Sequence, residues 1–68
     1  MTRDEVRPFY RRFVDIYYTH SKNPNVHNHV TGTVQGVHHK FIILLVNDED
    51  QEIAIQYKNI KDIRASIR

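Results

Sequence analysis

The sequence predicts a mainly β fold, in which a short helix is followed by a small five-stranded β-barrel. The chain has 68 residues, which is the size of one small domain. Its apolar residues change from helical spacing near the N-terminus to alternation with a period of two from Phe13 onward. Gly32 and Gly36 interrupt an extended stretch and mark the bends that a barrel of so few strands needs. We therefore expect a single domain over 1–68, with a helix region at 1–12 and a barrel at 13–66.

The helix is predicted by a capping signal and by apolar spacing. Thr2 and Glu5 have the Ser/Thr-x-x-Glu spacing of a capping box. The apolar residues then repeat at i, i+3, i+4 and i+7: Val6, Phe9, Tyr10 and Phe13. Pro8 leaves two alternatives, because proline either kinks a helix or occupies its first position. The sequence predicts a helix within 2–12 and leaves its start open.

The first two strands follow from alternation and from turn-forming residues between them. Val14, Ile16 and Tyr18 are expected on one side of a strand that begins at Phe13. Residues 21–25 contain turn formers and a proline, so we expect a loop or the tip of a long hairpin there. The second strand is expected over 26–37, with one face formed by Val30, Gly32, Val34 and Gly36.

The next two strands are predicted on either side of an acidic turn. Residues 40–47 are almost all apolar, which is typical of a strand covered on both faces. Asn47-Asp48-Glu49-Asp50 is expected to form the turn, and residues 52–57 then alternate again.

The tail is consistent with two structures, because Ile60, Ile63 and Ile67 also have helical spacing. We favour a turn at Lys58-Asn59 and a short fifth strand, since four strands need one more to close a barrel.

Composition excludes several classes of protein. The chain has no cysteine, so it has no disulfide framework and no thiolate metal site, and a reducing, cytoplasmic setting fits it best. Its longest apolar run, 41–46, is too short to span a bilayer, and its N-terminal residues lack the apolar core that a secretory signal is expected to have. We therefore expect no membrane partner. A net charge of +2 and a pI near 9.2 permit nucleic-acid binding without demonstrating it.

Two segments resemble a known family. Lys40-Phe41-Ile42-Ile43-Leu44-Leu45, followed by Tyr57-Lys58-Asn59, is similar to the Gln-Phe-Val-Ile-Leu-Leu and Tyr-Lys-His segments of the Sm-like and Hfq family of RNA-binding ring proteins. The resemblance covers about residues 8–66. It implies an SH3-like (Sm-like) barrel that forms a homo-oligomeric ring, a hexamer, binds single-stranded RNA and acts in post-transcriptional regulation.

The resemblance also implies the RNA-binding residues. Those of the pore face would be Lys40, Phe41, Tyr57, Lys58 and Asn59. Tyr17 would hold adenines on the opposite face, and the Arg11-Arg12 pair would contact RNA at the rim. Base stacking on an aromatic ring contributes roughly 1–3 kcal/mol per base, and a ring of lysines attracts phosphate. The chain departs from the family at Lys40, which replaces glutamine, at Asn59, which replaces histidine, and in two longer turns.

One argument for a ring does not depend on the family resemblance. Residues 51–57 form a regular strand without proline, glycine or lysine, so an exposed edge there would pair with another chain. Pairing with the last strand of a neighbour, repeated head to tail, closes a ring if the rotation allows it.

Two other functions remain open. The same small barrel could serve as a protein-interaction module without RNA binding, with its aromatic residues in the core. A zinc or pH-sensing surface is the third alternative, suggested by five histidines: His20, His27, His29, His38 and His39. Because no cysteine and no HExxH spacing accompany them, we expect no metal and no cofactor. No nucleophile elbow or phosphate-binding glycine loop is present, so we expect no enzyme.

Overall fold

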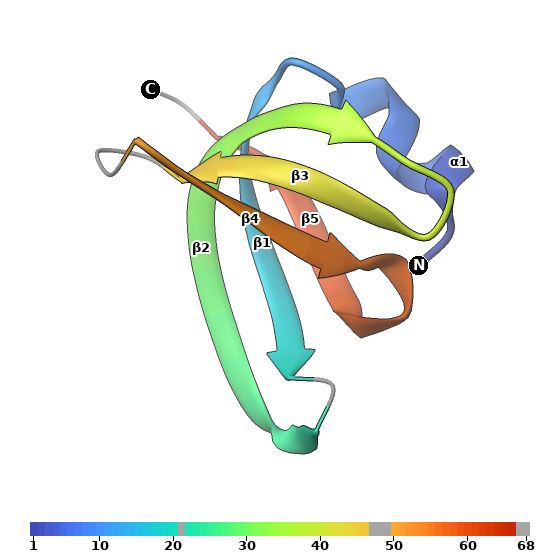
Figure 1. Ribbon diagram of the computed structural model, residues 1–68, viewed down its shortest axis with the longest axis vertical. Coiled ribbons are helices and arrows are strands. Elements are labelled where there is room, and N and C mark those ends of the chain that lie inside the picture. The colour runs from blue at the N-terminus through green and yellow to red at the C-terminus, as the bar shows by residue number, and fades with distance from the viewer. Residues whose placement is uncertain (21, 47–49, 67–68) are drawn as a thin grey trace.

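The computed structural model describes residues 1–20, 22–46 and 50–66 and has a mainly β architecture (Figure 1). The chain begins with α1 (Arg3–Val6), which continues directly into a 3-10 turn, η1 (Arg7–Phe9). Five strands follow: β1 (Phe13–His20), β2 (Asn23–Val37), β3 (Phe41–Val46), β4 (Gln51–Gln56) and β5 (Ile60–Ala65), the last two joined by the 3-10 turn η2 (Tyr57–Asn59). The predicted class, a short N-terminal helix followed by five strands, is confirmed.

The strands form one antiparallel sheet in the order β4-β3-β2-β1-β5. The sheet is curved but not closed, so the prediction of a closed barrel is wrong (Figure 1). The fifth strand forms as expected, but it pairs with β1, in a register that sets Ile63 opposite Ile16, and not with β4. The strand alternative for the tail is thereby confirmed over the described residues. β4 and β5 are the two edges of the sheet.

The helical segment resolves the ambiguity at Pro8. Both bonds of the predicted capping box are present, since the Glu5 N–H donates to Thr2 and the Thr2 N–H donates to the Glu5 carboxylate. The α-helix therefore starts directly after Thr2. It ends at Val6, and the backbone continues as the tighter 3-10 turn η1, which contains Pro8. Val6 is fully buried and anchors the segment to the sheet.

The hydrophobic core lies on the concave side of the sheet. Its fully buried residues alternate along β1, β2 and β3: Val14, Ile16, Val34, Ile42 and Leu44. The expected burial of the third strand on both faces is wrong, because Phe41, Ile43 and Leu45 remain half-buried. A single curved sheet covers only its inner face, so the outer apolar residues of β3 stay partly open.

β2 bends at the two predicted glycines. A Cβ at Gly32 would overlap the carbonyl oxygen of Leu45, so only glycine lets β3 approach there. The register with β3 shifts between Val34 and Gly36, which is the mark of a β-bulge. The first half of β2 pairs with β1 alone and forms the expected long hairpin (Figure 1). β2 begins at Asn23, three residues before the expected start, and Ser21 of the expected loop lies outside the described residues. Of the predicted acidic turn, Asn47–Glu49 also lie outside the described residues. No described helix has the length and apolar character needed to cross a membrane.

Candidate nucleic-acid interface

Five predicted site residues meet at one end of the sheet: Lys40, Phe41, Tyr57, Lys58 and Asn59. The Tyr57 N–H donates to the Lys40 carbonyl oxygen at 3.1 Å, and Phe41 lies opposite Gln56 in the β3–β4 register. The β2–β3 turn and η2 therefore lie side by side. Residues 17 positions apart in the sequence are thus brought into one surface.

Tyr57 connects the segments of this surface through its hydrogen bonds. Its ring is only 6% exposed, and its hydroxyl donates to the His38 carbonyl oxygen at 2.6 Å. The Met1 nitrogen donates to the Tyr57 carbonyl oxygen at 3.3 Å. Burial raises the pKa of the Tyr57 phenol, while the positive charge of Arg3 lowers it by less. Tyr57 thus ties the N-terminal segment, the β2–β3 turn and η2 to one another, and its ring faces the core.

Phe41 presents the aromatic surface of this cluster. It is half-buried and stacks on His38, with ring centroids 4.8 Å apart and an angle of 18° between the ring planes. The turn that brings them together is closed by the His38 N–H, which donates to the Phe41 carbonyl oxygen at 2.9 Å. Sequence reasoning did not assign His38 to this cluster. Its spacing of three residues from Phe41 across a turn is the signal that could have identified it.

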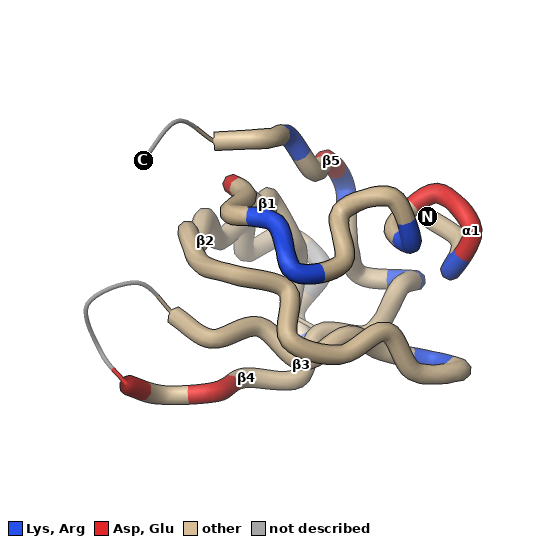
Figure 2. Tube along the Cα trace, turned by 90° about the horizontal axis from the view of Figure 1, so that it is seen from above, with Lys and Arg blue, Asp and Glu red and all other residues tan. Residues whose placement is uncertain are grey.

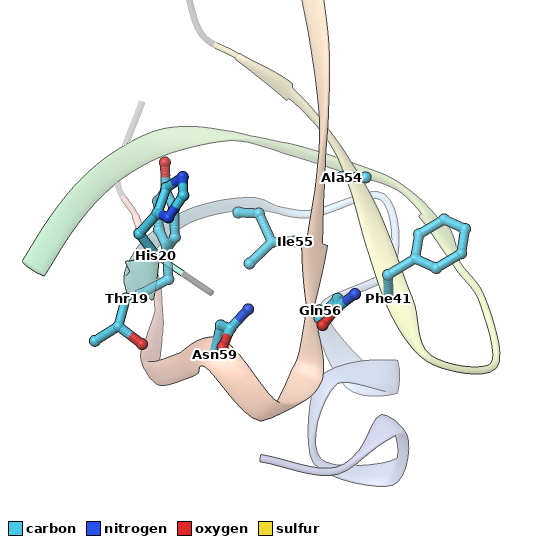
Figure 3. Close-up of a pocket in the computed structure, with 8 residues that line it drawn as sticks. Thr19, His20, Phe41, Ala54, Ile55, Gln56 and Asn59 are labelled. Atoms are coloured by element: carbon cyan, nitrogen blue, oxygen red, sulfur yellow. The ribbon is translucent and has the colours of Figure 1, made fainter. Parts of the chain in front are cut away.

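A hollow of about 310 Å³, which we call the edge hollow, lies where the end of β1, β4 and η2 meet (Figure 3). Its lining combines apolar and amide side chains: Tyr18, Thr19, His20, Phe41, Ala54, Ile55, Gln56 and Asn59. Thr19 is only 4% exposed. Gln56 in the edge hollow was not predicted, because its position depends on β4 being an open edge.

A second hollow of about 710 Å³, the cationic hollow, lies beside it and shares Gln56. Its other lining residues are Met1, Thr2, Arg3, His39, Lys40, Tyr57 and Lys58. Among the described residues, no aspartate or glutamate lines it. Asp50 directly precedes β4 and Glu52 lies near its start, so Glu52 is about 13 Å, at strand spacing, from Gln56 at the other end of the strand. Figure 2 shows the acidic start of β4 on the side of the molecule away from the N-terminus.

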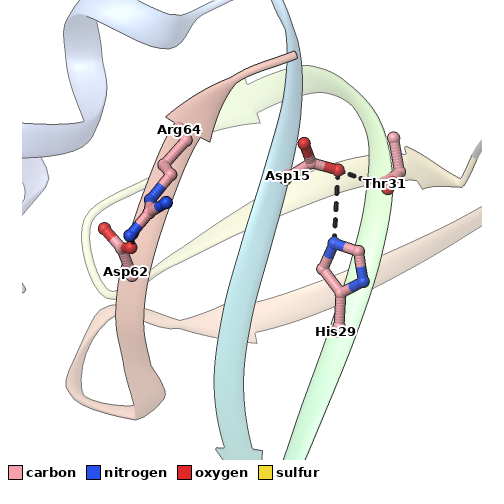
Figure 4. Close-up of polar contacts among 5 residues, drawn as sticks. All are labelled: Asp15, His29, Thr31, Asp62 and Arg64. Atoms are coloured by element: carbon pink, nitrogen blue, oxygen red, sulfur yellow. Dashed lines mark hydrogen bonds and ion pairs between the residues drawn. The ribbon is translucent and has the colours of Figure 1, made fainter.

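Tyr17 lies on the outer face of β1, 43% exposed, and stacks on His29 of β2. The ring centroids are 4.5 Å apart, with 15° between the planes. The His29 Nε2 lies 3.2 Å from Asp15 Oδ1, and the Thr31 hydroxyl donates to the same oxygen at 2.6 Å (Figure 4). The Thr31 hydrogen bond is the main cause that lowers the pKa of Asp15. This arrangement presents a stacked aromatic pair to solvent.

Further histidines and charged residues lie near this pair. His27 lies on the same side of β2 as His29, since their β1 partners are Thr19 and Tyr17. On β5, Arg64 pairs with Asp62 at 2.7 Å (Figure 4). Within the part of the chain that the structure describes, no three His, Cys, Asp or Glu side chains come together to hold a metal.

Arg11 and Arg12 lie apart from the cationic hollow, in the turn between η1 and β1. Their backbones pair with β2, because the Arg11 N–H donates to the Val34 carbonyl oxygen at 2.8 Å and the Val34 N–H donates to the Arg12 carbonyl oxygen at 3.1 Å. Arg11 has a left-handed backbone, with a φ of 64°. Both side chains are exposed, and the Arg11 guanidinium lies 5.3 Å from the centre of the Tyr10 ring.

The chain was compared with protein-family models, curated proteins and solved structures, and none of them matches. The chemistry of the site therefore rests on the described geometry: an aromatic ring for stacking, amides for hydrogen bonding and cations for phosphate.

Proposed function

We propose that this chain is an Sm-like RNA-binding protein of the cytoplasm that forms a homo-oligomeric ring, a hexamer, and binds single-stranded RNA in post-transcriptional regulation. One observation carries the proposal. The strand order leaves β4 and β5 as the edges of the sheet, and the cluster of Lys40, Phe41 and Lys58 lies beside the end of β4. The same edge that would join two copies thus lies next to the groups that would contact RNA.

The hydrogen-bonding direction of β4 supports assembly through its edge. In an antiparallel pair, hydrogen-bonded and non-hydrogen-bonded positions alternate. The Tyr57 N–H faces β3, since it bonds to Lys40, so the N–H groups of Glu52, Ala54 and Gln56 point away from β3. A row of outward N–H groups on a strand without proline or lysine is a template for another strand. β5 of a neighbouring copy would satisfy it, and repetition would close a ring.

Stacking and charge support RNA as the ligand. Phe41 backed by His38 would stack a base, and Tyr17 backed by His29 would stack a second base on another surface. Lys40 and Lys58 would contact phosphate, and a ring would repeat them in every copy. Because the ring of Tyr57 is buried, its part is to position Lys58 rather than to stack a base. Asn59 would contribute to the edge hollow, and Arg11 and Arg12 would serve the rim.

The test combines solution mass with RNA binding. Light scattering should give about 49 kDa, six times the 8.2 kDa chain. Oligo(U) and oligo(A) should bind, with affinity that falls steeply as salt is added. Phe41→Ala and Lys58→Ala should each weaken binding about tenfold or more. Lys22→Ala, at an exposed lysine in the β1–β2 turn that lines neither hollow, is the matched control. A single-chain mass together with no binding at low salt would reject the proposal in favour of a protein-interaction module.

A further inference from the structure

We infer that the cationic hollow is a site for a clustered terminal phosphate, the phosphorylated end of an RNA strand, in addition to the phosphodiesters along the strand. Arg3, Lys40 and Lys58 line it from three separate segments: α1, the β2–β3 turn and η2. The identity of the ligand as RNA rests on the proposed function. The affinity of the hollow for clustered phosphate does not.

The three segments are fixed relative to one another. Tyr57 receives a hydrogen bond from the Met1 nitrogen, donates through its backbone to Lys40, and donates through its hydroxyl to His38. These bonds surround a ring that is almost fully buried. The fold therefore holds the cations around one hollow, so binding does not incur the entropic cost of bringing their segments together.

The cations of the hollow form no ion pair among the described residues. Within the described residues, the ion pairs join Arg7 to Asp4, His29 to Asp15 and Arg64 to Asp62. Arg3, Lys40 and Lys58 take part in none of them. The nearby Glu5 carboxylate already accepts from the Thr2 N–H and hydroxyl in the capping box. Three exposed cations without a carboxylate partner thus share a space of about 710 Å³.

The chemistry of the lining favours a phosphate cluster over a base. The Tyr57 ring in the lining is buried, so the exposed imidazole of His39 is the one stacking surface that the described lining residues offer. The lining instead offers the Arg3 guanidinium, two lysine ammonium groups and the Gln56 amide, which are all hydrogen-bond donors. A phosphodiester carries one negative charge, whereas a terminal phosphate carries about −1.5 to −2 at pH 7, and a triphosphate carries more. Three cations match a terminal group better than one phosphodiester.

Gln56 connects this site to a base. It lines both hollows, so a strand end with its phosphates in the cationic hollow would place its first base near Phe41, in the edge hollow. His39, exposed on the rim of the cationic hollow, adds a further donor.

The experiment compares three RNA oligomers of one sequence that carry a 5′-triphosphate, a 5′-monophosphate or a 5′-hydroxyl. Binding is measured by fluorescence anisotropy with a 3′ label, and inorganic triphosphate is titrated separately by calorimetry. The triphosphate oligomer should bind about tenfold or more tightly than the hydroxyl oligomer. Arg3→Ala and Lys40→Ala should remove this preference, and Lys22→Ala, outside both hollows, should keep it. All three residues are exposed, so the variants should fold.

The outcomes separate this inference from the proposed function. Equal affinity for the three oligomers would overturn the terminal-phosphate site and leave RNA binding intact. Binding of inorganic triphosphate that Arg3→Ala weakens, without binding of any RNA, would support the hollow as a phosphate site and reject the proposed function. No binding of RNA or of inorganic triphosphate would overturn both.

Discussion

At the scale of single residues, Gly32 has the strictest steric requirement in the chain. Its place opposite Val46 brings the β3 backbone so close that a Cβ would overlap the Leu45 carbonyl oxygen. At Gly36 a Cβ would instead meet the Nε2 of His38 at 2.9 Å, the far end of a side chain that can turn away. The backbone conformation is ordinary at both glycines, which have no positive φ. The constraint therefore comes from packing and not from dihedral strain.

We expect Gly32→Ala to lower the free energy of unfolding by about 1–3 kcal/mol, because backbone must move to admit the methyl group. Gly36→Ala is the matched control and should change it by less than about 1 kcal/mol. Urea unfolding followed by circular dichroism measures both. Equal effects of the two substitutions would contradict the steric explanation.

Asp15 makes the stability of the fold depend on pH in the acid range. Its pKa is lowered in the folded chain, chiefly by the hydrogen bond from Thr31. A carboxyl with a lowered pKa stabilises the fold above its unfolded pKa, and this contribution is lost as the pH falls through the folded value. The loss should therefore occur below about pH 4.

In Thr31→Val, which removes the hydroxyl and keeps the shape, we expect the Asp15 pKa to return toward its usual value of 3.8. The measurement is an NMR titration of the Asp15 carboxyl carbon in both proteins. An unchanged titration midpoint in the variant would show that the His29 contact, and not Thr31, controls this carboxyl.

At the scale of elements, α1 has only four residues, which is too short to be stable by helix propensity alone. Two features hold it in place: the capping box between Thr2 and Glu5, and the fully buried side chain of Val6. The segment matters for function because α1 contributes Arg3 to the cationic hollow. The stability of a small helix and the geometry of the site are therefore linked.

We expect Val6→Ala to destabilise the protein by about 1–3 kcal/mol and Thr2→Ala by about 1 kcal/mol, since one loses core packing and the other an exposed cap. Thermal or urea unfolding compares them, and Thr2→Ser, which keeps the hydroxyl, serves as the control. A cost for Thr2→Ser as large as that for Thr2→Ala would argue against capping as the mechanism.

At the scale of the whole molecule, the open sheet is the feature that sets how copies would join. β4 has one partner, β3, and its outward N–H groups lie at Glu52, Ala54 and Gln56. Proline at an outward position of an edge strand removes an N–H that the chain itself does not use in the β3–β4 ladder. Such a substitution separates assembly from folding.

We expect Ala54→Pro to reduce the solution mass from that of the ring to that of a single chain while the β circular dichroism spectrum is retained. Ala54→Ser keeps the N–H at the same exposed position and should leave the mass unchanged. Light scattering of both variants is the measurement. A ring that persists in Ala54→Pro would show that β4 is not the assembly edge.

Much of the fold could be predicted because its signals are local. The capping box at Thr2 and Glu5, the alternation of Val14, Ile16 and Tyr18, and the turn predicted at Lys58-Asn59 each depend on residues close in sequence. Each is present in the structure, the turn as part of η2. The grouping of Lys40, Phe41 and Lys58 was also expected, although their RNA-binding role stays a prediction. The stacking of His38 on Phe41 and of His29 on Tyr17 was not expected, because it depends on a turn and on cross-strand register.

The sequence by itself determined the order and type of the elements, since hydrophobic period, capping and turn residues act over a few positions. Only the tertiary structure decided that the sheet stays open, that β3 is covered on one face, and that Arg3 joins Lys40 and Lys58 in one hollow. These features depend on which strand pairs with which and on how far the sheet curves. Both are set by contacts between residues distant in the chain, such as Ile16 with Ile63 and Gly32 with Val46. A pattern of neighbouring residues does not predict such contacts.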